Sequence, residues 1–97
     1  MPRYVSLIDW TEKGAESFHE TVDRFEAAQQ TFEKMGVRFV DIYWTLGAHD
    51  IVGILDAPDD ETATAALLAV GSLGNIRTRT LRAFSGEEMR AIIDKAI

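Results

Sequence analysis

Two adjacent residues near the middle of the chain, His49 and Asp50, carry the side chains best suited to chemistry. They belong to the stretch GAHD, between two apolar runs. A histidine oriented by a carboxylate can act as a general base or contact a ligand near neutral pH. Because neighbouring residues of a strand point to opposite faces, the orienting carboxylate is expected to be Asp41 or Asp9. The alternative is an ordinary turn, in which His49 is exposed and Asp50 stabilises the backbone.

Three arginines follow the stretch GSLGN and form a second candidate site. Arg77 and Arg79 share one face of a predicted strand, and Arg82 lies on the other. Arginine grips carboxylates well, so the shared face could bind an anion. The structural alternative pairs these arginines across strands with acids such as Asp41 or Asp56. A phosphate loop is not indicated, because GSLGN closes a helix instead of opening one.

Aromatic side chains provide a third possibility. Trp10, Tyr43 and Trp44 could stack a flat ligand, although strand aromatics more often belong to a core or an interface. Gly53, inside a predicted strand, indicates a bulge or a close approach by another backbone or a ligand. His49, Asp50, Tyr43, Asp41, Arg77 and Trp10 are therefore the candidate ligand-binding residues, with His49 the one candidate for catalysis.

Metal, thiol and nucleophile chemistry have little support. The chain has no cysteine, and its two histidines, His19 and His49, have no metal-ligand spacing. No serine stands in a G-x-S-x-G context. We therefore expect neither a bound metal nor a cofactor.

Length and charge narrow the class of protein. The 97 residues predict one domain, 46% hydrophobic and 27% charged. The net charge of -6 disfavours binding to nucleic acid or to an anionic membrane. The N-terminus MPRYVSLIDW does not resemble a signal peptide, and no apolar stretch approaches the roughly 18 residues of a membrane span. We expect a cytoplasmic protein.

Apolar periodicity predicts strands over residues 3–10, 37–46, 50–57 and 76–84. It predicts helices over 20–36, from 58–60 to the GSLGN stretch, and over 85–97. Thr21 is the expected N-cap of the first long helix and Gly36 its stop. The order β-α-β-β-α-β with a C-terminal helix is the ferredoxin-like α+β arrangement, with both helices on one face of a four-stranded antiparallel sheet.

The other face of that sheet must meet water or a partner. In the strand over 37–46, strict alternation predicts two sets on opposite faces: Val40, Ile42, Trp44 and Leu46 on one, and Phe39, Asp41, Tyr43 and Thr45 on the other. Either set exposes large aromatic groups, which usually mark an interface or a ligand site. The simplest expectation is a face-to-face homodimer or a higher oligomer.

Three strings, LIDWTEKG, LGAHDIVGILDAPDDETA and GSLGNIRTRTLRAFS, resemble the GYD domain family over nearly the whole chain. The resemblance implies one GYD-like domain over residues 1–97 and a dimeric α+β barrel fold. The family is named for a Gly-Tyr-Asp motif at the start of the third strand. Here Gly47 and Asp50 match that motif in character, and His49 stands where the tyrosine is expected. Related barrel groups include monooxygenases, lactone isomerases and ligand-sensing modules.

Three functions remain open at this point. The leading one is an oligomeric module that binds a small molecule, in a pocket between sheet and helices or inside the dimer barrel. The second is a cofactor-independent monooxygenase or isomerase that uses His49 as its acid or base. The third is a structural or regulatory protein that binds another protein.

Overall fold

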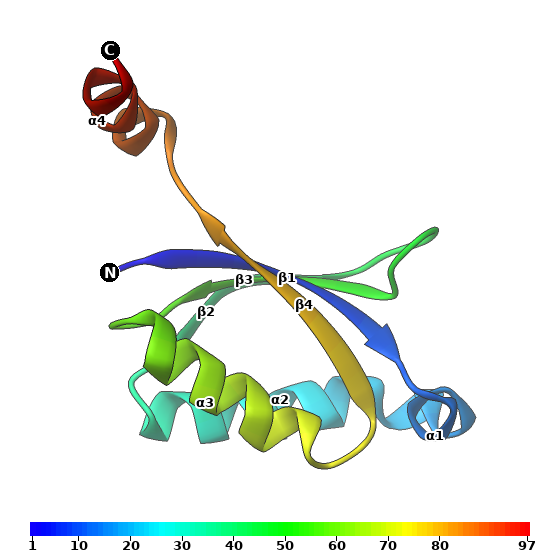
Figure 1. Cartoon of the computed structure of the whole chain (residues 1–97). Helices are drawn as coiled ribbons and strands as arrows, with labels where there is room; N and C mark the ends of the chain where they lie inside the picture. Colours follow the sequence, from blue (N-terminus) through cyan, green and yellow to red (C-terminus); the bar gives the residue numbers. More distant parts are fainter.

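Four antiparallel strands and two long helices form two layers. The computed structural model describes all 97 residues. Strands β1 (Arg3–Trp10), β2 (Arg38–Trp44), β3 (Ile51–Asp56) and β4 (Ile76–Ala83) make one sheet in the order β2-β3-β1-β4. Helices α2 (Thr21–Lys34) and α3 (Asp60–Gly71) cover the same face of it (Figure 1). This is the ferredoxin-like order that the sequence predicts.

Three shorter elements complete the chain. Helix α1 (Glu12–Glu16) and the 3-10 turn η1 (Phe18–Glu20) connect β1 to α2, and helix α4 (Gly86–Ala96) follows β4. None of the helices combines the length and the apolar composition that crossing a membrane requires.

Local chemistry fixes most helix ends. Asp59 caps α3 by accepting a hydrogen bond from the Thr62 amide at 2.7 Å. Gly36 follows α2 with a φ of 78°, the left-handed conformation that glycine adopts easily. The prediction that Thr21 caps α2 was wrong. Because η1 directly precedes the helix, the Thr21 backbone is already helical and Glu20 is the N-cap residue, with no side-chain cap hydrogen bond.

Strand β2 departs from strict alternation. A bulge between Phe39 and Asp41 shifts the register of β2 against β3. Phe39 therefore points toward the helices, as Ile42 does, although the two were predicted on opposite faces. The bulged residue Val40 breaks the period of two. The strand is also shorter than predicted, since it ends at Trp44 and leaves Leu46 fully exposed in the loop.

The core lies between the sheet and the helices. Its buried members are Tyr4, Phe32, Val37, Leu55, Ala57, Ala63 and Ala66. The Phe32 and Phe39 rings stack with centroids 4.8 Å apart, and the Phe25 ring meets Phe39 edge-on at 5.0 Å. These contacts join α2 to the inner face of β2.

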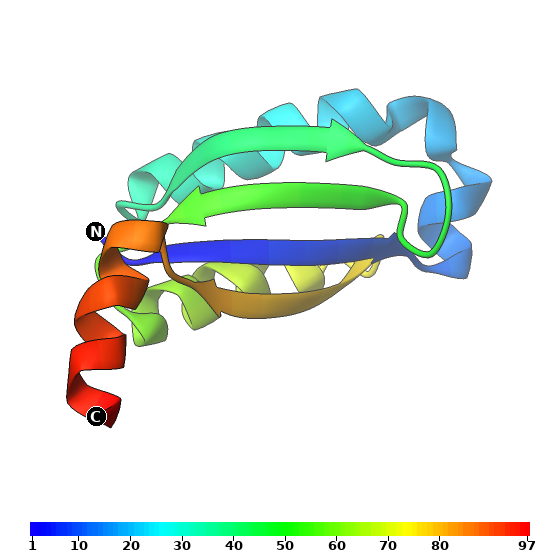
Figure 2. The same ribbon diagram turned by 90° about the horizontal axis from the view of Figure 1, so that it is seen from above.

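The opposite sheet face has no covering layer. Figure 2 shows all four strands from this side, with α2 and α3 behind them. We call this surface the open face. The strand register places apolar Val5, Leu7, Val52, Ile54 and Leu81 on it. Each is half-buried or exposed in the chain as it stands.

Candidate functional site

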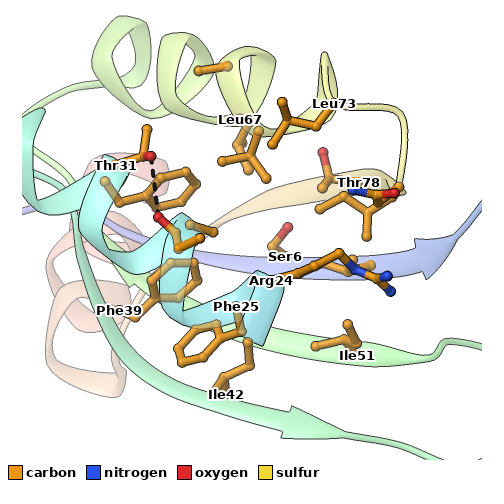
Figure 3. Close-up of a pocket in the computed structure, with 18 of the residues that line it drawn as sticks. Ser6, Arg24, Phe25, Thr31, Phe39, Ile42, Ile51, Leu67, Leu73 and Thr78 are labelled. Atoms are coloured by element: carbon orange, nitrogen blue, oxygen red, sulfur yellow. Dashed lines mark hydrogen bonds between the residues drawn. The ribbon is translucent and has the colours of Figure 1, made fainter. Parts of the chain in front are cut away.

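A cavity of about 280 Å³ lies between the inner sheet face and helices α2 and α3 (Figure 3). Fourteen of its 20 lining residues are hydrophobic. All four strands and both long helices contribute to the wall, and the α3–β4 connection adds Leu73 and Asn75. A mostly apolar wall with a few polar groups is the usual composition of a small-molecule site.

Small side chains leave the space open. Ala27 and Ala28 face the cavity from α2, and Ala69 from α3. The larger Phe25 and Phe32 on α2 reach the sheet and hold the helix away from it. The cavity is thus a consequence of alternating large and small residues on the helices.

Several polar groups of the wall already have partners. The Ser6 hydroxyl is buried and lies 2.9 Å from the Thr80 hydroxyl. The Arg24 guanidinium donates to the carbonyl oxygens of Ser17 and Gly14 at 2.9 and 3.1 Å. These bonds fix the positions of the side chains, and they leave little capacity for a ligand.

Other polar groups of the wall are free to bind. The Thr78 hydroxyl and the Asn75 side-chain amide form no hydrogen bond within the chain, and both belong to half-buried residues that line the cavity, since every fully buried polar side-chain atom has a partner. Thr78 lies opposite Ile8 on β1, so its side chain points to the helix side of the sheet. A hydroxyl and an amide on an apolar wall can each bind a hydroxyl or carbonyl group of a ligand.

The cavity wall has almost no side chain that could act as a general acid or base. Arg24 is the one ionisable side chain among its lining residues. Tyr4, whose pKa burial and a hydrogen bond to Asp60 raise to about 12, belongs to the core and does not line the cavity. Nor does Asp56, whose pKa is lowered by its hydrogen bond to Arg3. The arrangement therefore favours binding over proton-transfer catalysis.

His49 lies elsewhere, in the loop between β2 and β3. Its Nδ1 atom is 3.2 Å from Oδ2 of Asp9, one of the two carboxylates that the sequence offered as its partner. The Asp50 carboxylate instead accepts a hydrogen bond from the Trp10 amide at 2.9 Å. The loop is further closed by a hydrogen bond from the Thr45 amide to the Asp50 carbonyl at 2.8 Å. Asp50 thus joins the end of β1 to the start of β3.

The remaining predicted residues are spread over both faces. Tyr43 and Asp41 are exposed on the open face of β2. Arg77 is on the same face, in register with Asp9. Trp10 points the other way, and its indole donates to the Thr21 hydroxyl at 3.3 Å.

The predicted pairing of the β4 arginines with Asp41 or Asp56 was wrong. Asp56 binds Arg3 instead, with Nε and Oδ1 2.9 Å apart, because these two residues are in register on neighbouring strands. Arg77 forms no ion pair, and Arg82 packs its guanidinium 4.5 Å from the Phe84 ring. No three acidic or histidine side chains gather in a way that could hold a metal ion.

None of the six sequence candidates lines the cavity. The residues that do include Ser6, Thr78 and Asn75, which the sequence analysis did not single out. One signal was available, since Ser6 stands between Tyr4 and Ile8 on the inward side of β1, where it is the one residue without an aromatic or aliphatic side chain. A polar residue at such a position needs a partner or a ligand.

Comparisons with known proteins agree with this fold. A family model described as the GYD domain matches residues 4–93. A Thermus thermophilus protein named glutamine synthetase and cystathionine beta-lyase binding protein is 36% identical over 84 residues, which cover 86% of this chain and 88% of that protein.

Two solved structures share the architecture. A crystal structure of a protein from Thermus thermophilus superposes with a TM-score of 0.58 at 22% identity, covering 89% of this chain and 96% of the other. The 5-chloro-2-hydroxyhydroquinone dehydrochlorinase of Burkholderia phenoliruptrix AC1100, solved with 2,5-dihydroxybenzoquinone, gives a TM-score of 0.61 at 13% identity, covering 90% and 97%. At such low identity these two likenesses concern the fold alone. The match over residues 4–93 makes this chain a member of the GYD domain family.

Proposed function

We propose that this GYD-domain protein binds a small, largely apolar molecule in the cavity between its sheet and helices. The observation that carries the proposal is the cavity of about 280 Å³ with the unpaired Thr78 hydroxyl and Asn75 amide on its wall. Since a dry cavity of roughly 150 Å³ accommodates benzene, a substituted aromatic ring is a suitable size. The preferred ligand carries a hydroxyl or carbonyl group for Thr78 or Asn75.

A thermal-shift screen with substituted phenols and aromatic ketones tests this proposal. A ligand at 100 times its Kd stabilises the folded chain by about 2.7 kcal/mol, which raises Tm by roughly 10 °C or more for a domain of this size. Ala28→Leu fills part of the cavity and should abolish the shift. Ala65→Leu, on an exposed part of α3 outside the cavity, should leave it unchanged. Equal shifts in the two variants, or no ligand in the screen, would contradict the proposal.

Acid–base catalysis by His49 on a ligand held in this cavity lacks support. His49 does not line the cavity, and its Nδ1 atom contacts Asp9 on the far side of β1. The enzyme hypothesis thus requires a second pocket on the open face.

A second candidate function is the binding of another protein. Its support is the name of the Thermus thermophilus relative, which describes a binding protein of two enzymes. An exposed apolar pair, Phe18 and Val22, offers a contact surface on η1 and the first turn of α2. Co-sedimentation of this chain with the glutamine synthetase of its own source organism tests whether it binds that enzyme. Phe18→Asp should abolish co-sedimentation, and no complex with the unaltered chain would refute it.

We also propose that the working form is a homodimer or a higher oligomer. The isolated chain exposes 6510 Å², whereas a compact monomer of 10.8 kDa exposes about 5,500 Å². The excess of about 1,000 Å² compares with the roughly 800 Å² that each partner buries in a standard interface. Sedimentation velocity over a range of concentrations tests this proposal, and a monomer throughout would refute it.

A further inference from the structure

Helix α4 is the least covered element of the fold. None of its residues is buried. Met89 and Ile93, one turn apart on its apolar side, are 46% and 44% exposed, and Phe84 just before the helix is 51% exposed. Figure 1 shows α4 standing apart from the rest of the chain, beyond the end of β4.

An isolated helix of this length is not stable in water. The 11 residues of α4 fall short of the roughly 12 to 15 that even alanine-rich helices need. A capping box between Ser85 and Glu88 favours the start of the helix, but most helical stability in proteins comes from packing an apolar face. Met89, Ile92 and Ile93 provide such a face; Ile92 is half-buried against the chain, and Met89 and Ile93 stay exposed. The helix therefore requires a surface that the chain does not supply.

The position of α4 indicates where that surface comes from. The helix lies on the side of the sheet opposite to α2 and α3, which is the side of the open face (Figure 1). A second sheet packed on the open face would stand about 10 Å above it. It would fill the space beside α4. An occupant of the open face thus meets the sheet and the apolar side of the helix together.

Charge makes a second copy of this chain the best occupant. The chain as a whole carries a net charge of -6, which disfavours self-association. The open face, however, is nearly balanced. Its charged residues are Arg3, Arg38, Arg77, Arg79, Asp9, Asp41 and Asp56. Arg3 and Asp56 already pair with each other and Asp9 contacts His49, so across two such faces Asp41 of one copy can pair with Arg38, Arg77 or Arg79 of the other, around the shared apolar centre of a two-fold symmetric interface.

We propose that α4 of each copy packs against the other copy in a dimer formed through the open faces. The inference rests on the proposed homo-oligomer and adds that α4 is exchanged between subunits. The radius of gyration of one chain is 14.6 Å, against about 12.5 Å for a compact domain of 97 residues. In the proposed dimer, the apolar side of α4 covers part of the partner, so the helix no longer protrudes and the dimer is compact.

Sedimentation of two matched variants tests the role of α4. Ile93→Asp places a charge on the apolar side of the helix, and Ala91→Asp places the same charge at an exposed position about half a turn away. Because burying an unpaired charge is costly, Ile93→Asp should weaken the dimer by roughly tenfold to a hundredfold. Ala91→Asp should leave the Kd unchanged. Ile93 is not part of the core, so far-ultraviolet circular dichroism should show that the body of both variants stays folded.

An NMR experiment separates exchange from other contacts of α4. Dimers are prepared from one methyl-labelled copy and one deuterated, nitrogen-labelled copy. Nuclear Overhauser effects from the Ile93 methyl groups to amides of the other copy are expected. Nuclear Overhauser effects confined to one chain, or equal dimer dissociation constants for Ile93→Asp and Ala91→Asp, would refute the exchange of α4 without refuting the dimer. A monomer at all concentrations would overturn both.

Discussion

Replacing Gly14 by alanine tests how tightly α1 is joined to the connection that borders the cavity. Gly14 is buried in α1, and a Cβ atom added to it would lie 2.0 Å from the carbonyl oxygen of Asn75. The obstructing atoms belong to the backbone, so no side-chain rotation relieves the overlap. The same Asn75 oxygen accepts a hydrogen bond from the Thr11 amide at 3.0 Å. Gly14→Ala must therefore push α1 away and stretch that bond.

The size of the effect follows from three contributions. Overpacking costs about 1–3 kcal/mol, and a lost hydrogen bond about 0.5–1.5 kcal/mol. Alanine also reduces the conformational entropy of the unfolded chain, which offsets about 0.4–1 kcal/mol of this loss. We expect Gly14→Ala to lower the free energy of unfolding by about 2 kcal/mol, which corresponds to a fall in Tm of roughly 10 °C. Urea denaturation and a thermal melt both measure it.

Gly71→Ala is the matched control. Gly71 is the last residue of α3, its added Cβ meets nothing within 4 Å, and its φ is not positive. This substitution should leave stability unchanged or raise it by about 0.5 kcal/mol. If the two variants were equally stable, the close approach of α1 to Asn75 would not constrain the fold. Since Asn75 also lines the cavity, Gly14→Ala should in addition weaken ligand binding there.

Three further predictions concern titration and helix capping. Because the folded pKa of Tyr4 is about 12 and the ordinary value about 10, its stabilisation is complete below pH 10 and is lost as the pH rises toward 12. Tyr4→Phe removes the hydrogen bond to Asp60 and should lower the free energy of unfolding by about 1 kcal/mol at neutral pH. In that alkaline window the urea midpoint of Tyr4→Phe should fall less with rising pH than that of the unaltered chain. The pKa of Asp56 is lowered by Arg3, so this ion pair stabilises the fold above the ordinary aspartate pKa and is lost as the pH falls; Asp56→Asn should reduce the acid sensitivity of unfolding. Ser85→Ala removes the N-cap of α4 and should speed amide exchange in that helix about fivefold, while global stability stays constant because α4 does not belong to the core.

Residue patterns in the sequence predict the element order well, because the signals are local. The capping residues Thr11, Asp59 and Ser85 each stand three residues before the amide they bind, and each begins a helix in the structure. The turn at GAHD was also expected, with Gly47 at a φ of 123° reversing the backbone. Such features depend on residues within one turn of each other.

The faces to which the β2 side chains point could not be predicted in the same way. Alternation separates Phe39 from Ile42, and nothing in the local string VRFVDIYW reveals that Val40 is bulged. The bulge depends on pairing with β3, where Gly53 leaves room beneath the Phe39 ring. A Cβ atom added to Gly53 would lie 3.6 Å from Cε1 of Phe39. No other backbone approaches this Cβ position; its nearest neighbours are the core side chains of Phe39 and Ile8, and the bulge lies in β2 opposite.

The cavity escaped the sequence analysis for a related reason. Its wall combines residues from all four strands and two helices, and its polar members are far apart in the chain. Ser6 and Thr78 come together because β1 and β4 are neighbours in the sheet with Ser6 in register with Thr80. Residue types that act in motifs, such as His49 beside Asp50, attract attention in a sequence, whereas dispersed hydroxyls do not.

The cavity and the His49–Asp9 pair lie on opposite faces of strand β1. Tyr4, Ser6 and Ile8 point toward the helices, and Asp9 points to the open face, where it contacts His49 and stands opposite Arg77. A ligand in the cavity is thus separated from the imidazole by the strand itself. A second copy on the open face would instead lie close to His49. His49, which stands where the family resemblance places a tyrosine, therefore lies nearer to the proposed dimer interface than to the cavity.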